Sequence, residues 1–236
     1  MDNQYQREVL AFGNEAINIL HSSHVCVFGI GGVGSFCVEA LARAGVGEIS
    51  LVDDDVFSLT NLNRQLYATH SSIGKYKCDV AKERILDINP ECKVHIYILR
   101  YLSDTKGQID LSSFDYVVDA IDTIQGKISL VEEANKVNTP IIASMGAGNK
   151  IDVTKIEVGD IYSTSVDPLA KVLRKELKQR NIEKLKVVFS KEAPIEIKKE
   201  FLDDNKIVPS SNSFVPPAFG LTLAGEVILD LIKYRK

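Results

Sequence analysis

The chain has 236 residues, of which 45% are hydrophobic and 25% charged, with a net charge of −4. This composition is ordinary for a soluble globular protein, and the length suffices for one large domain or one domain with an appended lobe. The polar start Met1–Gln4 excludes an apolar signal segment at this position, and no apolar run reaches the length of a membrane span. We therefore expect a cytoplasmic protein without membrane attachment.

The four cysteines all lie within the first 92 residues and form no CxxC pair. This pattern argues against a disulfide framework and against a four-cysteine zinc site. Cys26 lies in a predicted strand and Cys37 in a predicted helix, where cysteine usually acts as a small apolar residue. The four histidines have no metal-ligand spacing along the chain, so we expect ordinary structural or surface roles for them.

The first predicted elements lead into a nucleotide-binding unit. Residues 4–20 have helical spacing with a break at Gly13, and Arg7 is a lone base there for which a surface role is the default. The apolar run Val25–Phe28 predicts a buried strand. The glycine turn Gly29-Ile-Gly31-Gly32-Val-Gly34 and a helix from Ser35 to Ala44 come next.

A second strand, Ile49–Val52, ends at Asp53, 19 residues after Gly34. Strand, glycine turn, helix, strand and terminal acid are the parts of a dinucleotide-binding unit. The glycines allow the backbone to approach a diphosphate, and the helix N-terminus offers free N–H groups. The terminal carboxylate is placed to accept hydrogen bonds from a ribose.

Strands and helices continue to alternate up to about residue 145. The expected elements are a helix over 74–89, a strand over 94–99, a strand over 115–122, a helix over 125–137 and a strand over 140–144. This alternation predicts an α/β fold with a doubly wound, Rossmann-like, mostly parallel sheet.

The pattern changes after Gly148. We expect a strand over 153–158, a basic helix capped by Asp167 and Pro168, a strand over 186–190, a loop over 203–217 and a helix over 219–236. The last helix could belong to the core or to a dimer face. The sequence thus predicts a single domain, 1–236, in which a nucleotide-binding core (1–145) carries a C-terminal strand and helix extension (146–236).

The loop after Asp53 distinguishes between classes of nucleotide. Asp53–Asp55 is followed by Asn61-Leu-Asn63-Arg64-Gln65 and, thirteen residues after Arg64, by Lys77. A helix N-terminus stabilises an anion by at most about 2 kcal/mol, so a triphosphate needs cations as well. Arg64 and Lys77 could supply them, whereas a nicotinamide enzyme needs no such cluster.

Asp122 ends the predicted strand 115–122, at the carboxyl edge where open α/β sheets bind ligands, and could hold the Mg²⁺ that accompanies ATP. Simpler roles remain open for these residues: Asp54 as a solvated turn acid, Asn61 and Asn63 as loop caps, and Arg64 as an ion-pair partner.

The charge of the chain is unevenly distributed. From Lys171 to Lys199 there are ten basic and four acidic residues, a local charge of +6 that leaves −10 on the remainder. Such a segment is a candidate surface for a polyanion, although a solvated helix face would give a similar count.

The order of these motifs resembles the ThiF/MoeB superfamily of ATP-dependent adenylating enzymes, over residues 5–145. The matching features are GxGGxG, D-x-D, N-x-N-R-Q, the lysine thirteen residues on, and D-A-I-D. The resemblance implies ATP and Mg²⁺ as cofactors, a catalytic role for Arg64, Lys77 and Asp122, and a metal-binding role for Asp122. The nucleotide would be bound by Gly29, Gly31, Gly32, Gly34, Asp53, Asp55, Asn61, Arg64, Gln65 and Lys77. In this superfamily an N-terminal arginine, here Arg7, can reach ATP from the partner subunit of a homodimer.

Branches of this superfamily that transfer activated carboxylates to sulfur need a thiol beyond the core, and this chain has no cysteine after Cys92. The chain instead resembles the tRNA threonylcarbamoyladenosine dehydratase branch. The residues that carry this resemblance are Ser23–Gly47, Ile88–Cys92, Val117–Asp122, Asp167–Lys178 and Val188–Glu192. The chain differs from that branch in being shorter between about Val188 and Phe219.

The resemblance to that branch implies tRNA as a partner. It also implies that the basic segment binds the tRNA phosphates, through residues that include Lys171, Arg174, Lys175 and Lys178. It also implies that the threonyl carboxylate is adenylated and that the carbamoyl group then closes a ring and releases AMP. Two alternatives remain open. One is an adenylating enzyme for a ubiquitin-like sulfur carrier ending in Gly-Gly. The other is a non-catalytic, nucleotide-bound scaffold for a partner such as a cysteine desulfurase system.

Overall fold

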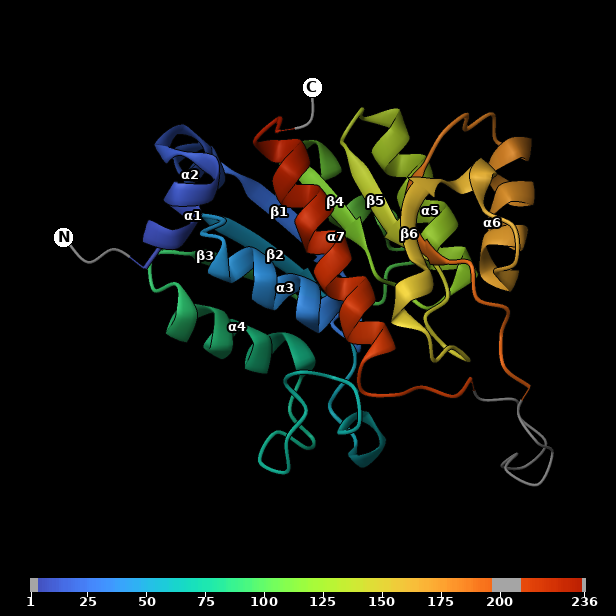
Figure 1. Ribbon diagram of the computed structural model, residues 1–236, viewed down its shortest axis with the longest axis horizontal. Helices are drawn as coiled ribbons and strands as arrows, with labels where there is room; N and C mark the ends of the chain where they lie inside the picture. Colours follow the sequence, from blue (N-terminus) through green and yellow to red (C-terminus); the bar gives the residue numbers. More distant parts are fainter. Residues whose placement is uncertain (1–3, 197–208, 235–236) are drawn as a thin grey trace.

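A seven-stranded sheet forms the centre of the protein, in a computed structural model that describes residues 4–196 and 209–234 (Figure 1). The strands are β1 His24–Phe28, β2 Glu48–Val52, β3 Lys93–Tyr97, β4 Tyr116–Asp119, β5 Ile141–Ser144, β6 Ile156–Asp160 and β7 Lys186–Ser190. Their order across the sheet is β3-β2-β1-β4-β5-β7-β6. Every neighbouring pair is parallel except β6 and β7, so the predicted doubly wound, mostly parallel sheet is confirmed.

Helices cover both faces of this sheet (Figure 1). They are α1 Gln6–Phe12, α2 Asn14–Ser22, α3 Gly34–Arg43, α4 Lys77–Ile88, α5 Ile124–Lys136, α6 Pro168–Gln179 and α7 Val215–Leu231. Of these, α3, α4 and α7 pack on one face and α5 and α6 on the other. Gly13, with a φ of +86°, separates α1 from α2, as the sequence predicts.

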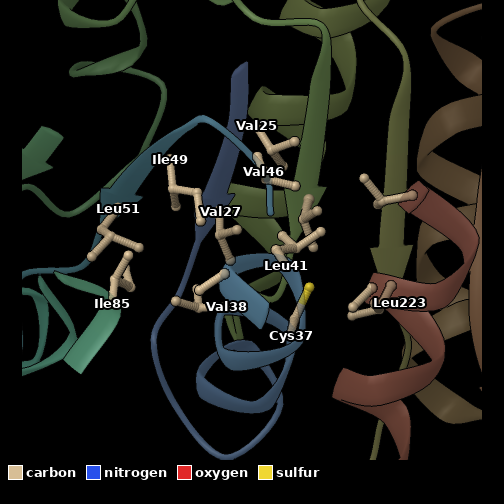
Figure 2. Packing of buried hydrophobic residues seen from close by; sticks show 14 of the residues in the cluster. Val25, Val27, Cys37, Val38, Leu41, Val46, Ile49, Leu51, Ile85 and Leu223 are labelled. Atoms are coloured by element: carbon tan, nitrogen blue, oxygen red, sulfur yellow. The ribbon is translucent and has the colours of Figure 1, made fainter. Parts of the chain in front are cut away.

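The two faces of the sheet use alternate residues of the same strands, as the two-residue period of a strand requires. Val25 and Val27 of β1 join the cluster beneath α3 and α7, together with Leu41 and Leu223 (Figure 2). Cys26, between the two valines, faces the cluster beneath α5. All four cysteines are buried with free thiols, so the predicted apolar role of Cys26 and Cys37 is confirmed.

Several predicted boundaries differ from those in the structure. The strand over 115–122 ends at Asp119, so Asp122 lies in the loop before α5. The strand predicted over 153–158 begins later, as β6 (Ile156–Asp160), because a 3₁₀ turn, Val153–Lys155, takes up its first residues. The predicted loop over 203–217 lies partly outside the described residues. Its last prolines, Pro216 and Pro217, begin α7 instead, because proline fits the first helical turn, where its missing N–H is not needed.

The C-terminal helix α7 is part of the core, lying against α3 on the face of the sheet (Figure 1). Two carboxylates of this helix, Glu226 and Asp230, form ion pairs with Lys186 of β7, at 2.8 and 2.7 Å. Among the described helices, including α7, none is long and apolar enough to cross a membrane.

Gly220 sets the separation of α3 and α7, which leads to a prediction with an internal control. A Cβ at Gly220 would lie 2.2 Å from the backbone oxygen of Val33, whereas a Cβ at Gly225 of the same helix meets nothing within 4 Å. Alanine normally stabilises a helix relative to glycine by roughly 0.5–1 kcal/mol. We expect Gly225→Ala to follow that rule and Gly220→Ala to lower the free energy of unfolding by about 1–3 kcal/mol through overpacking. Urea unfolding of both variants measures the difference, and equal effects would contradict this account of the α3–α7 contact.

Candidate nucleotide-binding site

The glycine turn between β1 and α3 depends on two close backbone approaches. Gly29 has a φ of +88°, and a Cβ there would lie 2.6 Å from the backbone oxygen of Ala120. A Cβ at Gly34 would lie 1.8 Å from the backbone oxygen of Gly29. Side chains are therefore excluded at both positions, which brings the turn, the start of α3 and the end of β4 together at the carboxyl edge of the sheet. Anions bind at this kind of helix N-terminus.

Asp53 connects the glycine turn to the loop that follows β2. Its Oδ2 accepts a hydrogen bond from the Ile30 N–H at 2.6 Å, and its Oδ1 accepts one from the Asp55 N–H at 2.9 Å. Burial raises the pKa of the Asp53 carboxyl, and Lys77 together with these two N–H groups offsets part of that rise. Each carboxylate oxygen has a second lone pair, so Asp53 can hold the turn and also accept from a ligand hydroxyl.

Lys77, the first residue of α4, is a buried cation beside two carboxylates. Its Nζ lies 2.6 Å from Oδ2 of Asp55 and 3.6 Å from Oδ1 of Asp53. The Lys77 side chain is only 6% exposed, whereas that of Asp55 is 67% exposed. Asp55 can therefore turn into solvent when an anionic ligand arrives, and the ammonium group of Lys77 then becomes available to it.

The side chains of Asn61, Arg64 and Gln65 have three different environments. The Asn61 side chain accepts from the Ser58 N–H at 3.0 Å, which is the loop-capping role that the sequence left open. The guanidinium of Arg64 is anchored by hydrogen bonds from Nη1 to the Thr60 carbonyl and the Asn63 side chain, both 2.9 Å. The Oε1 of Gln65 is buried and has no hydrogen-bond partner within the described protein. A buried acceptor without a partner is unfavourable, so Gln65 is suited to accept from a ligand.

One pocket brings most of these residues together. It has a volume of about 990 Å³ and is lined by the predicted residues Gly29, Gly31, Gly32, Asp53, Asp55, Asn61, Arg64, Gln65, Lys77 and Asp122. Asp122 is exposed in the loop between β4 and α5. Gly34 supports the turn from beneath and does not line the pocket. Arg7 is exposed on α1, beside α2 at the amino end of β1, and is likewise not among the lining residues.

A buried ion pair lies below the pocket and is not predicted by the sequence. Nζ of Lys127 in α5 donates to Oδ1 of Asp119 at 3.1 Å and to the Ser144 carbonyl at 2.7 Å. Both side chains are at most 1% exposed. The pair ties the carboxyl ends of β4 and β5 to α5 and so positions the loop that carries Asp122. Asp119 is the first residue of the D-A-I-D motif, but no motif or spacing in the sequence identifies Lys127 as its ion-pair partner.

The same pocket extends towards the C-terminal part of the chain. This second half is lined by Ser144–Lys150, the start of α6 and Pro209–Ser211. Lys150 and Asp167 form a buried ion pair there, 3.3 Å apart, and Asp167 also caps α6 by accepting from the Ala170 N–H at 2.8 Å. The predicted Asp167 cap is thus confirmed. The cavity is continuous from the glycine turn to α6, so it can take a nucleotide together with a second group.

Ion pairs and hydrogen bonds account for part of the basic segment. Arg180 pairs with Glu132 and Glu176, and Lys186 with Glu226 and Asp230. Arg174 is half-buried and donates to the carbonyl and hydroxyl of Thr164. The other residues predicted to contact tRNA are Lys171, Lys175 and Lys178. They are exposed on α6 at positions i, i+4 and i+7, which share one helix face.

The fold and the pocket define a nucleoside-phosphate-binding α/β protein, with a glycine turn, buried cations and carboxylates at the carboxyl edge of a parallel sheet. The chain belongs to the ThiF family, whose model matches residues 5–232.

The chain is similar to the tRNA threonylcarbamoyladenosine dehydratase of Bacillus subtilis strain 168. The two are 47% identical over 244 residues, covering 99% of this chain and 96% of the relative. The protein of that name from Escherichia coli K12 is 42% identical over 167 residues, 71% of this chain and 62% of the relative. The crystal structure of E. coli TcdA in complex with AMP matches with a TM-score of 0.89 and 33% identity, covering 98% of this chain and 94% of that one. E. coli TcdA has also been crystallised in complex with ATP.

Proposed function

We propose that this chain is an ATP-dependent enzyme that dehydrates threonylcarbamoyladenosine in tRNA. The observation that carries the proposal is one continuous cavity, which Asp53, Lys77 and Asp122 line together with the glycine turn and which continues to the start of α6. One half has the groups that a nucleotide needs, and the other half has room for the group to be activated. The similarity to proteins named as this dehydratase, over nearly the full length for the B. subtilis relative, supports the choice of substrate.

In the first step the threonyl carboxylate of the substrate attacks the α-phosphorus of ATP. A P–O bond forms, the bond to the β-phosphate oxygen breaks, and pyrophosphate leaves. Arg64 and Lys77 offset the negative charge that grows on the phosphates. Lys77 exchanges its contact with the exposed Asp55 for a phosphate oxygen, while Asp53 accepts from the ribose and Gln65 gains a donor for its buried oxygen.

In the second step an atom of the carbamoyl group attacks the acyl carbon of the adenylate. A five-membered ring closes, AMP leaves with the carboxylate oxygen, and the proton lost from the carbamoyl group completes the removal of one water. This nucleophile belongs to the substrate, so it has a high effective molarity and needs no enzyme thiol. The chain has none to offer in its second half, and its four cysteines are buried.

Mg²⁺ fits the pocket through the chemistry of its donors. The ion prefers carboxylate and phosphate oxygens and retains several waters, and Asp122 is an exposed carboxylate at the pocket rim. Asp122 would hold the ion, which when bound supplies charge compensation at the phosphates of ATP.

The experiment that tests this function measures AMP and pyrophosphate release with and without tRNA that carries threonylcarbamoyladenosine. We expect release to depend on that tRNA and the modified nucleoside to lose the mass of one water. Release with a Gly-Gly-tailed carrier protein but not with tRNA would identify a sulfur-carrier adenylating enzyme. ATP binding without turnover on either would support the scaffold alternative, in which a cysteine desulfurase system is the partner.

We propose that tRNA phosphates contact the exposed face of α6. The triple change Lys171→Glu, Lys175→Glu, Lys178→Glu should weaken tRNA binding and flatten its dependence on salt, because each phosphate contact releases counterions. Lys136→Glu, on the exposed part of α5, is the control for reversing one surface charge elsewhere. Filter binding at several salt concentrations measures both quantities. An unchanged affinity for tRNA in the triple variant would show that this face of α6 is only solvated and does not contact tRNA.

We also propose that the chain acts as a homodimer in which Arg7 reaches the pocket of the partner subunit. Its position on α1, away from its own pocket, supports this assignment. Arg7→Ala and Lys77→Met should each abolish turnover, and mixing equal amounts should restore about a quarter of wild-type activity. Half of the random dimers then contain one pocket with both groups intact. No recovery on mixing, in samples shown to exchange subunits, would contradict a role in trans.

A further inference from the structure

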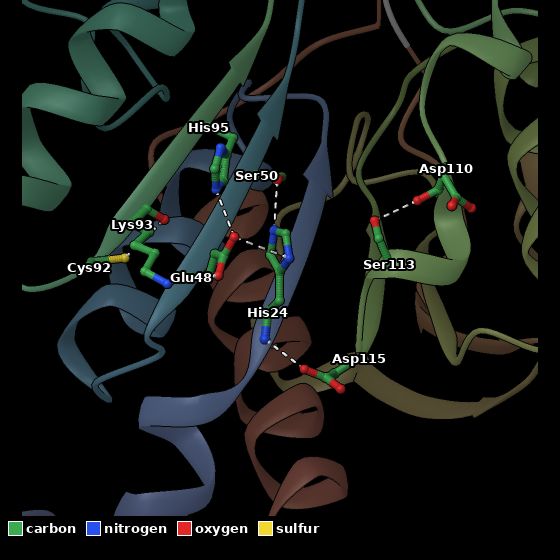
Figure 3. A network of polar contacts seen from close by, with 9 residues as sticks. All are labelled: His24, Glu48, Ser50, Cys92, Lys93, His95, Asp110, Ser113 and Asp115. Carbon is green, nitrogen blue, oxygen red and sulfur yellow. Dashed lines mark hydrogen bonds and ion pairs between the residues drawn. The ribbon is translucent and has the colours of Figure 1, made fainter.

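A second group of ligand-type side chains lies at the amino end of the sheet, opposite the nucleotide pocket (Figure 3). His24 is the first residue of β1, Glu48 the first of β2, and His95 lies in the middle of β3. In the sheet register His24 is opposite Glu48, and His95 is opposite Ser50. Partners in register share a face, as do residues two apart along a strand. All three side chains therefore project from the same face, although they are far apart in the sequence.

The ligand atoms of the three side chains all lie within 4.8 Å of one another, close enough to share one metal ion. Nε2 of His95 lies 2.7 Å from Oε1 of Glu48, and Nδ1 of His24 lies 3.6 Å from the same oxygen. A tetrahedral zinc ion with bonds of about 2.0–2.1 Å holds its ligand atoms about 3.3 Å apart. To reach this spacing, the hydrogen bond between His95 and Glu48 would lengthen by about 0.6 Å and the distance from His24 to Glu48 would shorten by about 0.3 Å.

The neighbouring groups orient His24 as metal ligands are oriented. In the tautomer in which Nε2 carries the proton, His24 donates to the hydroxyl of Ser50 at 2.9 Å, and the lone pair of Nδ1 faces Glu48. Metal-binding histidines commonly use their second nitrogen in this way. The ring also packs edge-on against Phe114, 4.7 Å between centroids, and the backbone N–H of His24 donates to Asp115.

We propose that His24, Glu48 and His95 form a binding site for a divalent transition-metal ion of the zinc type, with water in the remaining position. Two imidazoles and one carboxylate are a donor set that suits zinc. The His95 side chain is 46% exposed, which leaves a path for the ion. Lys93 lies 3.9 Å from the other oxygen of Glu48, but its side chain is 75% exposed and can move into solvent. A bound ion would tie β1, β2 and β3 together.

A cysteine ligand is not part of this site. Cys92 lies next to Lys93 in the chain, but its thiol is directed to the Lys93 carbonyl and is largely buried (Figure 3). A second group of carboxylates that could hold a cation, Asp53, Asp54 and Asp55, lies in the nucleotide pocket. The experiment below distinguishes binding there from binding at His24, Glu48 and His95.

The test is calorimetric titration of the full chain, stripped of metal with EDTA, with zinc chloride in a non-coordinating buffer. We expect one zinc ion per chain and a higher melting temperature with zinc. His95→Ala and Glu48→Gln should each weaken binding at least about tenfold. His70→Ala, at another exposed histidine, and Cys92→Ser should leave it unchanged.

His95 and Glu48 are partly exposed, so the melting temperature without zinc can verify that both variants fold. Zinc-induced shifts of the ring signals of His24 and His95 in NMR spectra provide a readout that a folding defect would not produce. An absence of saturable binding, or equal affinity in wild type and in both folded variants, would overturn the proposal. The second result would move the ion to the aspartates of the nucleotide pocket.

Discussion

Asp122→Asn should lower the rate of pyrophosphate release by at least about 100-fold, the scale of loss when one electrostatic contact to a transition state is removed. Asp122 is exposed in a loop, so its carboxylate contributes little to the fold, and the melting temperature should stay near that of the wild type. ATP affinity should change much less than turnover. The measurement is AMP and pyrophosphate release with tRNA carrying threonylcarbamoyladenosine, over a range of Mg²⁺ concentrations.

Asp54 provides a matched control for this experiment. It is also an exposed carboxylate lining the same pocket, and the sequence favours for it the role of a solvated turn acid. Asp54→Asn removes the same charge from the same cavity and should leave turnover within a few-fold of wild type. If Asp122→Asn is as active as Asp54→Asn, the carboxylate of Asp122 does not take part in the reaction.

Local signals in the sequence predict the first half of the fold well. The apolar run Val25–Phe28, the glycines after it and the helix that they begin are all determined by near neighbours in the chain. The break at Gly13 is similar, since a φ of +86° is readily adopted only by glycine. The prolines at 216 and 217 misled the prediction, because proline is compatible both with a loop and with the first turn of a helix.

Contacts between distant segments could not be predicted in this way. Lys127 lies in a helix, where a lysine is usually exposed, and its burial beside Asp119 depends on how α5 packs on the sheet. The cluster of His24, Glu48 and His95 shows the same limit. Its histidines have no metal-ligand spacing in the chain, and only the register of three strands brings them together. The glycine turn and the acid at the end of β2 belong to a recognisable sequence motif. The Lys127–Asp119 pair and the histidine cluster do not.

Lys127→Met should lower the free energy of unfolding by about 3–5 kcal/mol at pH 8, because it leaves the buried charge of Asp119 without its partner. Lys127 also donates to the Ser144 carbonyl, so that acceptor loses a hydrogen bond too. Oδ2 of Asp119 has no hydrogen-bond partner within the described residues. Urea unfolding at pH 8 and at pH 5 measures the loss, with wild type as the reference.

The stability lost in Lys127→Met should become smaller as the pH falls, because protonation removes the unpaired charge of Asp119. Burial raises the pKa of its carboxyl even with Lys127 present, and without that cation the pKa should rise further. A folded-state pKa above the unfolded value means that stability is retained at low pH and lost as the pH rises through the folded pKa. Adding Asp119→Asn to Lys127→Met removes the buried charge, so the double variant should recover most of the lost stability at pH 8 and lose the pH dependence. A double variant as unstable as Lys127→Met, at both pH values, would show that packing of the lysine chain, rather than the ion pair, stabilises this part of the sheet.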